Sequence, residues 1–354
     1  MDFGKTIHWF VTSRCNENCK FCFRPYFTGK SLLSEVAESM AKNRVESAVI
    51  TGGEPLILRN LEKPLGVLKD AGIDVSVHTN GILLSSERLD SLCRVVDEIA
   101  LPIDSLDRKT QAYLRGIDCL PQVRKALRQL QDKKVRIGIH TVASAVNMNH
   151  IPSIYKFLEH TRFDYWRVYE FNRDLVTNRC KTVQKCLEVE TLYGPAATEE
   201  DGGVNCLFAN FLLMEERIKQ RDGRVQFVGV HDYDRKPYFF LDQDGDAYMA
   251  TWFSQGRKLI GNILKDGFKS VKLRAIREYA KGPFFHEEDF IDAEQDKPLW
   301  ARAAWQGNYD AEELDMIDQK YNKRFVHLSR LYLDRLIKQG AAPADAEFCY
   351  TCSL

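Results

Sequence analysis

The sequence has no long hydrophobic run and no excess of charge of either sign. No stretch approaches the ~20 consecutive apolar residues that a helix needs to span a bilayer. Lys plus Arg number 50 and Asp plus Glu number 50, so no broad attraction to nucleic acid or to an anionic membrane is expected. Residues 1–10 contain no signal-peptide core before Thr12, Ser13 and Arg14 interrupt the apolar pattern. These absences predict a cytoplasmic protein.

The composition is that of an ordinary globular chain with many cysteines. Of 354 residues, 44% are hydrophobic and 28% are charged, which allows one large domain or one domain with an appendage. In a cytoplasmic chain of this size, ten cysteines are more typical of thiols and metal ligands than of disulfides. The spacing of these cysteines must therefore indicate their role.

Strand-like and helix-like segments alternate through the first half of the chain. Short apolar runs begin near residues 5, 46, 73, 97, 135 and 165, with helix-like segments between them. This alternation predicts parallel strands joined by right-handed crossovers. We expect an α/β fold, a partial (β/α)6 TIM-like barrel of about six parallel strands, with ligands bound at the carboxyl ends of the strands.

The alternation is lost from about Asn172. Residues 225–231 and 238–249 are predicted as strands, the second of them containing a hairpin turn at residues 242–246. Residues 311–339 are predicted to be mostly helical. We therefore divide the chain into a barrel domain, residues 1–171, and a smaller α+β C-terminal extension, residues 172–354. The extension is expected to cover the open side of the barrel.

Three cysteines lie close together directly after the first predicted strand. Cys15, Cys19 and Cys22 have the spacing C-x3-C-x2-C, and three thiolates on one loop can hold an iron–sulfur cube. Because a [4Fe–4S] cluster normally has four Cys ligands, three leave one iron open to a further ligand. The alternatives are a zinc site or unrelated thiols, but zinc prefers a fourth Cys or His, and His8 is the only histidine nearby.

This spacing, with Phe21 just before the third cysteine, resembles the radical S-adenosylmethionine (SAM) superfamily. The segment Thr51-Gly-Gly-Glu-Pro55 is similar to the family's GGEP segment. The resemblance implies an enzyme with a [4Fe–4S] cluster on the three cysteines and SAM on the open iron. It also implies an external one-electron donor, such as a flavodoxin or ferredoxin, and cleavage of SAM to a 5′-deoxyadenosyl radical.

The resemblance also implies which residues bind SAM. The glycines of the GGEP-like segment permit close backbone approach, and its glutamate or a backbone carbonyl is expected to hold the SAM ammonium group. Other candidates follow the third, fourth and fifth predicted strands, where the family binds the ribose, carboxylate and adenine. Two have structural alternatives, since Asn80-Gly81 is a good turn and Ser105 can cap a helix. The expected set is Phe21, Gly52, Gly53, Glu54, Thr79, Asn80, Ser105, Thr141, Val142 and Asn147.

Several segments resemble the viperin-like branch of the superfamily, which dehydrates a nucleoside triphosphate. Residues 8–14 resemble its H-F-T-R approach to the cluster, and residues 166–169 resemble its W-K-V-F strand. Gly138 stands where that branch has a triphosphate-binding lysine, and nothing after about Gly267 aligns with it. A small, nucleotide-like substrate is therefore expected without that branch's triphosphate grip.

Five further cysteines lie outside the predicted barrel: Cys180, Cys186, Cys206, Cys349 and Cys352. Cys349-Tyr-Thr-Cys352 has ligand spacing, and some relatives in the superfamily carry auxiliary Fe–S clusters in C-terminal extensions. Residues 248–253 contain no cysteine where such extensions often begin, although residues 261–263 resemble their G-N-I element. An auxiliary cluster and ordinary thiols both stay open.

Substrate contacts are expected from polar side chains at the strand ends. Arg24, Lys30 and Arg167 suit a phosphate or carboxylate, because arginine forks bind such anions well. Glu170, at the end of the sixth predicted strand, and Arg24 are the predicted substrate contacts. The other candidates are His78, His140, Tyr169 and Asn172.

Three functions fit the sequence. The first is an enzyme whose radical abstracts hydrogen from a small polar substrate, such as a nucleotide or sugar nucleotide. The second is a peptide-modifying enzyme, because the strands within residues 225–249 offer an edge that a leader peptide can join. The third is a non-catalytic sensor that binds the cluster and SAM without turnover. Cleavage of SAM separates the sensor from both enzymes.

Overall fold

Strands and helices alternate through the first 170 residues, as the sequence predicts. The structure is a computed structural model, and it describes residues 5–24, 27, 29–171, 191–192, 211, 214–215, 218, 221–228, 238–250 and 258–280. The first strands are β1 (Thr6–Thr12), β2 (Ser47–Gly52), β3 (Asp74–His78), β4 (Glu98–Pro102), β5 (Arg136–Ala143) and β6 (Tyr165–Glu170). The helices between them are α1 (Leu33–Lys42), α2 (Glu62–Asp70), α3 (Ser86–Leu92), α4 (Arg108–Arg115), α5 (Leu120–Leu130) and α6 (Ile151–Leu158).

The later strands extend the same sheet. They are β7 (Val225–Val228), β8 (Tyr238–Leu241), β9 (Asp246–Ala250) and β10 (Lys258–Asn262), and helix α10 (Phe268–Ala280) follows. The order in the sheet is β10-β9-β8-β1-β2-β3-β4-β5-β6-β7. β7 pairs parallel with β6, and β8 pairs parallel with β1, so the parallel part extends beyond the six strands predicted. The predicted hairpin is present, because β8 and β9 pair antiparallel.

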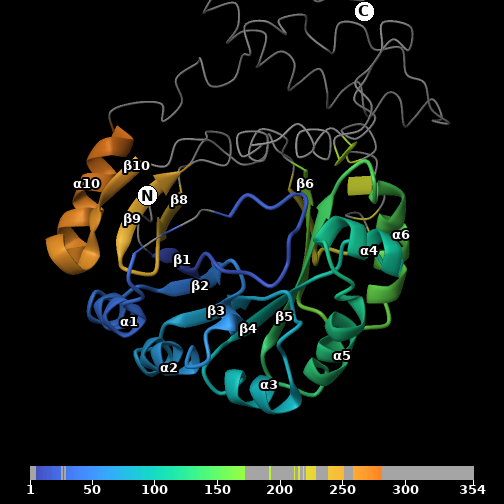
Figure 1. The fold of residues 1–354 in the computed structure, drawn as a ribbon, viewed down its shortest axis with the longest axis horizontal. Coiled ribbons are helices and arrows are strands. Elements are labelled where there is room, and N and C mark those ends of the chain that lie inside the picture. Colours follow the sequence, from blue (N-terminus) through green and yellow to red (C-terminus); the bar gives the residue numbers. More distant parts are fainter. Residues whose placement is uncertain are drawn as a thin grey trace, which may run out of the picture.

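The sheet curves, and helices α1 to α6 cover its outer side (Figure 1). The outward face is apolar: on β1, Ile7, Trp9 and Val11 alternate along the strand and are fully buried. Facing them, amphipathic helices bury one stripe each, such as Val123 and Leu127 on α5. The core therefore lies between the sheet and the helices, and the predicted fold class, a partial TIM-like α/β barrel, is confirmed.

The predicted division of the chain is only partly visible. Strands β7 to β10 come from the predicted extension, yet they belong to the same sheet as the barrel strands. The boundary between residues 171 and 172 stays a prediction, because residues 172–190 lie outside the described part. In the described ranges, no helix is long and apolar enough to cross a membrane.

Candidate active site

The three cysteines lie on one loop after β1, at the carboxyl end of the parallel strands. All three are free thiols; Cys19 is buried, and Cys15 and Cys22 are half-buried. The loop turns back on itself, because the Cys22 amide donates to the Cys19 carbonyl oxygen at 3.2 Å. This loop, residues 15–22, is called the cluster loop below.

Each cysteine sulfur has an N–H donor beside it. The Glu17 amide lies 3.4 Å from the Cys15 sulfur. The Arg24 guanidinium lies 3.4 Å from the Cys22 sulfur, and the Arg115 guanidinium lies 3.9 Å from the Cys19 sulfur. N–H donors and positive charges stabilise thiolates and metal-bound sulfur. The residues around the loop therefore fit a thiolate-ligated cluster.

Burial opposes ionisation of these thiols when no metal is present. Burial raises the pKa of Cys19 well above its usual value, and the Arg115 charge acts in the opposite direction. Burial also raises the pKa of Cys15, whereas the hydrogen bond from the Glu17 amide and the positive charge of Arg24 act to lower it. Metal binding must therefore displace protons from these cysteines, which is the usual coupling between thiolate ligation and pH.

The cluster loop is held by the end of helix α4. The amides of Lys20 and Asn18 donate to the carbonyl oxygens of Leu114, at 2.8 Å, and Arg115, at 3.3 Å. Gly116, directly after α4, has a φ of 76°, and a Cβ at this position would lie 2.9 Å from the Asn18 carbonyl oxygen. A glycine is required here by both the left-handed backbone and the close approach of the loop.

The predicted close approach at the GGEP-like segment is also present, and its partner is the backbone from the end of β1 to Arg14, just before the cluster loop. The amides of Gly53 and Glu54 donate to the carbonyl oxygens of Thr12, at 2.7 Å, and Arg14, at 2.8 Å. A Cβ on Gly53 would lie 2.0 Å from the Arg14 carbonyl oxygen, and one on Gly52 would lie 2.2 Å from that of Thr12. The two glycines therefore lock the end of β2 against the loop that carries the cysteines.

Glu54, Thr79 and Asn80 come together in one buried network. The Glu54 carboxylate accepts hydrogen bonds from the Thr79 hydroxyl at 2.6 Å, the Asn80 amide at 2.7 Å and the Leu56 amide at 3.0 Å. Burial raises the pKa of Glu54 to about 7, although these donors act to lower it. The Asn80 side chain also donates to Asn16 of the cluster loop at 2.7 Å. The network joins the ends of β2 and β3 to the cluster loop.

Ser105 and Thr141 are fully buried and bonded within the fold. The Ser105 hydroxyl lies 2.7 Å from His150 Nδ1 and accepts from the Asp107 amide at 2.9 Å. Thr141 donates to the Ile103 carbonyl oxygen and accepts from the indole of Trp166. The expected helix cap at Ser105 is instead Asp107, whose carboxylate accepts from the Thr110 amide at the start of α4.

Asn147 fastens the ends of β4 and β5 together. Its side-chain amide donates to the carbonyl oxygens of Asp104, at 2.7 Å, and Val142, at 2.9 Å, and its oxygen accepts from the Ser144 amide at 2.8 Å. Val142 is half-buried, and its amide donates to the Asp104 carboxylate at 2.8 Å. Three of the candidates at the ends of β4 and β5 use their side chains for hydrogen bonds within the protein: Ser105, Thr141 and Asn147. Val142 differs, because it keeps exposed surface.

The inner face of the barrel carries a cluster of histidines. The pleat of the strands turns His8 of β1, His78 of β3 and His140 of β5 away from the apolar core, and each keeps some exposed surface. The ring centroids of His78 and His140 are 4.6 Å apart, and Tyr169 lies 5.4 Å from His140. Burial lowers the pKa of His8 and of His78 to about 4, so both are neutral at physiological pH.

Arg167 adds the positive charge of this inner face. Its guanidinium lies 4.5 Å from the ring centre of Tyr165 and donates to the Gln226 side chain at 2.8 Å. No carboxylate of the described residues forms an ion pair with it. His8, His78, His140, Arg167 and Tyr169, called the inner polar face below, therefore offer neutral hydrogen-bonding groups and one cation.

The structure explains why residue 138 is a glycine. A Cβ at this position would lie 2.4 Å from the Tyr165 hydroxyl oxygen, so Tyr165 fills the space that a side chain on the middle of β5 would need. The Tyr165 hydroxyl donates to Glu98 at 2.7 Å, and Ser76 donates to the same carboxylate oxygen at 2.6 Å. Tyr165 and Glu98 thus form a floor below the inner polar face, next to Gly138.

The two predicted substrate contacts, Arg24 and Glu170, lie beside the cluster loop and at the end of β6, as expected. Arg24 contacts the Cys22 sulfur and donates to the Ser13 carbonyl oxygen at 3.1 Å, so it belongs to the surroundings of the cluster loop. Glu170 is buried and shares a strand face with Trp166 and Val168, opposite to Arg167. Because Glu170 lies on the buried face of β6, opposite to the face that carries Arg167, its position does not favour a contact with the substrate.

Other predicted residues are simply exposed or outside the described part. Lys30 is exposed, and Phe21 is half-buried with its ring 5.4 Å from the Arg115 guanidinium. Asn172 and the five later cysteines, Cys180, Cys186, Cys206, Cys349 and Cys352, lie outside the described residues.

Sequence reasoning missed the buried ion pairs around Cys19. Arg115 forms ion pairs with Asp104 at 2.6 Å and with Glu17 at 3.2 Å. These three residues come from the cluster loop, the end of β4 and the end of α4, so no local spacing joins them. The only local signal was Gly116, which marks a helix end.

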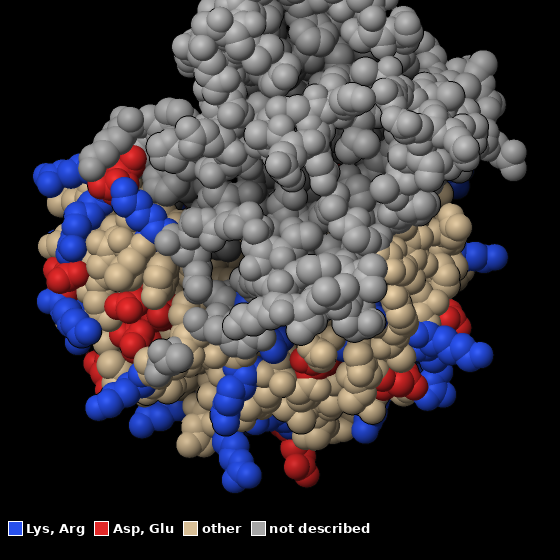
Figure 2. Space-filling model, turned by 45° about the horizontal axis from the view of Figure 1, so that its top comes forward, with Lys and Arg blue, Asp and Glu red and all other residues tan. Residues whose placement is uncertain are grey.

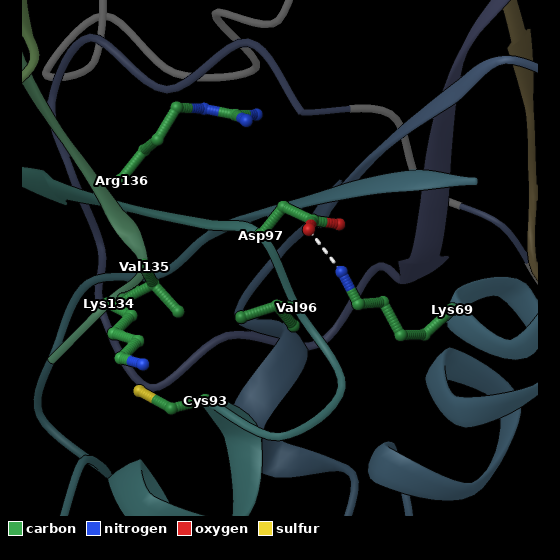
Figure 3. A pocket seen from close by; sticks show the side chains of 7 residues that line it. All are labelled: Lys69, Cys93, Val96, Asp97, Lys134, Val135 and Arg136. Atoms are coloured by element: carbon green, nitrogen blue, oxygen red, sulfur yellow. Dashed lines mark hydrogen bonds and ion pairs between the residues drawn. The ribbon is translucent and has the colours of Figure 1, made fainter. Parts of the chain in front are cut away.

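A cavity of about 310 Å³ lies at the other end of the barrel (Figure 3). It is located at the amino ends of β4 and β5, and the Lys69–Asp97 ion pair forms part of its wall. Catalytic groups of such barrels gather at the carboxyl ends of the strands, so this cavity is not the candidate site. Its lining residues are Lys69, Cys93, Val96, Asp97, Lys134, Val135 and Arg136.

The structure is a partial α/β barrel with three free cysteines on the loop after its first strand. Residues 9–158 match the family model of the Radical SAM superfamily, so this part of the chain resembles members of that superfamily. Members of the superfamily use a [4Fe–4S] cluster and SAM.

Proteins described as having different functions resemble this chain. It is 30% identical over 166 residues to a protein of Methanocaldococcus jannaschii described as a glycyl-radical enzyme activating enzyme, covering 44% of this chain and 64% of that one. It is 24% identical over 264 residues to an S-adenosylmethionine-dependent nucleotide dehydratase of Fibrobacter, covering 68% of this chain and 76% of that one. The chain thus spans less than two thirds of the methanogen relative.

Among solved structures, Streptococcus suis SuiB bound to its precursor peptide SuiA has the same fold. The TM-score is 0.58 at 16% sequence identity, with 79% of this chain and 68% of SuiB covered. At this identity the likeness concerns the fold alone.

Proposed function

We propose that the protein is a radical SAM enzyme that acts on a small polar substrate. The observation that supports this most is the cluster loop, where three free cysteines each have an N–H donor beside the sulfur. A [4Fe–4S] cluster with SAM, when bound, supplies a 5′-deoxyadenosyl radical for hydrogen abstraction. A cytoplasmic location and an external one-electron donor are part of this proposal, because the ligand thiols must stay reduced.

The residues of the chain divide between the two cofactors. Cys15, Cys19 and Cys22 would hold the cluster. Because the Glu54 carboxylate already accepts three internal hydrogen bonds, a backbone carbonyl of the GGEP-like segment is the better partner for the SAM ammonium group. The side chains of Ser105, Thr141 and Asn147 are buried, so they would act on the SAM site only by fixing the backbone at the ends of β4 and β5. Val142 keeps exposed surface that could contact SAM directly.

The inner polar face supports a small substrate with one anionic group. It carries one cation, Arg167, and histidines that are neutral at physiological pH. The floor below it contains the Glu98 carboxylate, which is already paired with Arg136 at 3.2 Å and accepts hydrogen bonds from Tyr165 and Ser76. A nucleotide or sugar nucleotide remains the preferred substrate class, in line with the function described for the Fibrobacter relative.

A peptide substrate is the second candidate, and the fold shared with SuiB favours it. Of the strands first considered for peptide addition, β8 is paired on both sides, by β1 and β9. An added peptide would therefore have to join β7 or β10, which end the strand order of the described sheet.

The metal content of the protein tests the proposed cofactor site. After anaerobic reconstitution, the wild type should be brown and hold about four irons per chain, the content of one [4Fe–4S] cluster. Simultaneous replacement of Cys15, Cys19 and Cys22 by Ala should remove the colour and the iron. Equal iron and an equal visible spectrum in this variant would show that the cluster is not on this loop. More than about six irons in the wild type would indicate an auxiliary cluster.

A further inference from the structure

Arg115 connects the cluster loop to the barrel. Its side chain is 11% exposed, its Nε donates to Asp104 at 2.6 Å, and another nitrogen of the guanidinium lies 3.2 Å from Glu17. Asp104 is fully buried and is itself fixed by the Val142 amide at 2.8 Å. The guanidinium is therefore anchored at the end of β4.

The guanidinium nitrogen that contacts Glu17 also lies beside a predicted cluster ligand, Cys19. The nitrogen that binds Glu17 lies 3.9 Å from the sulfur of Cys19, and this sulfur lies 3.3 Å from the Glu17 carboxylate. The second Glu17 oxygen is buried without a hydrogen-bond partner in the described part of the chain. Glu17 and Arg115 thus place one negative and one positive group directly beside Cys19.

The charges around this cysteine do not cancel. Two buried carboxylates, Asp104 and Glu17, face the single cation of Arg115. A thiolate on Cys19 adds a further negative charge, and a buried negative charge without a cation is strongly unfavourable. Arg115 is the only cation of the described residues with an ion-pair contact in this group.

We propose that Arg115 is a positioning residue of the cluster, which holds the Cys19 arm of the cluster loop and raises the reduction potential of the bound cluster, while Glu17 lowers it. The inference rests on the proposed function. One-electron reduction makes the cluster more negative, so a nearby cation with an N–H directed at a ligand sulfur stabilises the reduced state. A carboxylate beside the same sulfur has the opposite effect.

The alternative is that Arg115 only fastens α4 to the barrel, and the reduction potential separates the two roles. Arg115→Gln should have a more negative midpoint potential than the wild type and lose iron to a chelator about tenfold faster. Arg115→Lys keeps the charge but not the fork, so its potential should lie between the two. Arg108→Gln is the matched control, because Arg108 lies on the same helix and pairs with Asp118 at the surface.

A substitution with the opposite sign completes the experiment. Glu17→Gln leaves the Arg115–Asp104 ion pair in place and should shift the midpoint potential to a less negative value. Wild-type potential and wild-type iron retention in a folded Arg115→Gln variant would overturn the proposal. If that variant does not fold, Glu17→Gln decides: a less negative potential supports the proposal, and an unchanged or more negative one overturns it. A wild type without a cluster would contradict the proposed function itself, which a simple iron assay detects.

Discussion

At the scale of single residues, the glycines show most clearly how the sequence builds the site. Gly53 and Gly116 are positions where a Cβ would meet backbone at or beside the cluster loop. The Gly53 contact is with Arg14, just before the loop, at 2.0 Å, and the Gly116 contact is with Asn18, within the loop, at 2.9 Å. Gly138 leaves room for Tyr165 instead. The GGEP-like segment was predicted from the sequence to allow close approach, but the identity of the approaching backbone depends on tertiary packing and was not predictable.

We expect Gly53→Ala to damage the cluster site. Because the clash is with the Arg14 carbonyl oxygen, the backbone itself must move, which should cost about 3 kcal/mol and displace the cluster loop. Iron per chain after reconstitution should fall well below half of the wild-type value. Gly66→Ala is the control: it lies within α2 with no atom closer than 3.8 Å to the new Cβ, and should add up to about 1 kcal/mol of stability. Equal iron in both variants would contradict this account.

Glu54 predicts a specific pH dependence of stability. Burial raises its pKa from 4.5 to about 7, so the folded state binds the proton more tightly than the unfolded state. The stabilisation from this group is therefore complete below pH 4.5 and is lost as the pH rises through 7, by about 3 kcal/mol in total. Urea unfolding of the metal-free protein at pH 5 and pH 8 should show this loss in the wild type and not in Glu54→Gln. An identical pH dependence in both proteins would show that Glu54 does not titrate in this range.

At the scale of elements, the sequence predicts the fold well where strands and helices alternate regularly, and poorly where this alternation stops. The helices and strands up to residue 170 were predictable, because apolar runs alternate with amphipathic segments. The pairing of β7 with β6 and of β8 with β1 was not predictable, because the regular alternation of strand-like and helix-like segments in the sequence is lost after about Asn172. For β6, the side-chain parity was available from the sequence, and it places Arg167 and Glu170 on opposite faces.

This parity predicts which residue of β6 contacts the substrate. Arg167→Gln should reduce hydrogen transfer from substrate to 5′-deoxyadenosine about tenfold or more, because a charge-assisted hydrogen bond to an anionic group is lost. Cleavage of SAM without substrate should stay near the wild-type rate. Glu170→Gln should have a much smaller effect on hydrogen transfer.

Isotope transfer from a deuterated cell extract into 5′-deoxyadenosine measures both variants. A loss in Glu170→Gln with none in Arg167→Gln would restore the original prediction that Glu170 contacts the substrate, and the inner polar face would then not bind it.

The caps of neighbouring helices give an independent test of element stability. Asp107 caps α4, which holds the cluster loop, and Ser85 caps α3. Asp107→Ala and Ser85→Ala should each lower the free energy of unfolding by about 1 kcal/mol. Only Asp107→Ala should also speed the loss of iron to a chelator. The reason is that carbonyl oxygens at the end of α4 accept hydrogen bonds from the backbone amides of Asn18 and Lys20 in the cluster loop. Equal iron retention in both variants would mean that α4 is not what holds the loop.

At the scale of the whole molecule, the balance of charge agrees with a small-molecule or peptide substrate. Figure 2 shows Lys and Arg side chains interspersed with Asp and Glu on the face drawn, in keeping with the equal totals of 50 and 50. The resemblance to the superfamily and the candidate cluster ligands were accessible from the sequence because their spacing is local. Arg167, His78, His140 and Tyr169 of the inner polar face were also candidates from the sequence. The Arg115 ion pairs were not accessible, because their members come together only when distant elements pack in the barrel.

Formation of 5′-deoxyadenosine from SAM is the measurement that tests the central claim most directly. Reconstituted protein reduced with dithionite should convert SAM to 5′-deoxyadenosine and methionine, and the variant with Ala at Cys15, Cys19 and Cys22 should produce neither. If wild-type protein with an intact four-iron cluster produces no 5′-deoxyadenosine, even with cell extract supplied as substrate, the radical mechanism is wrong and the chain is a cluster-binding sensor.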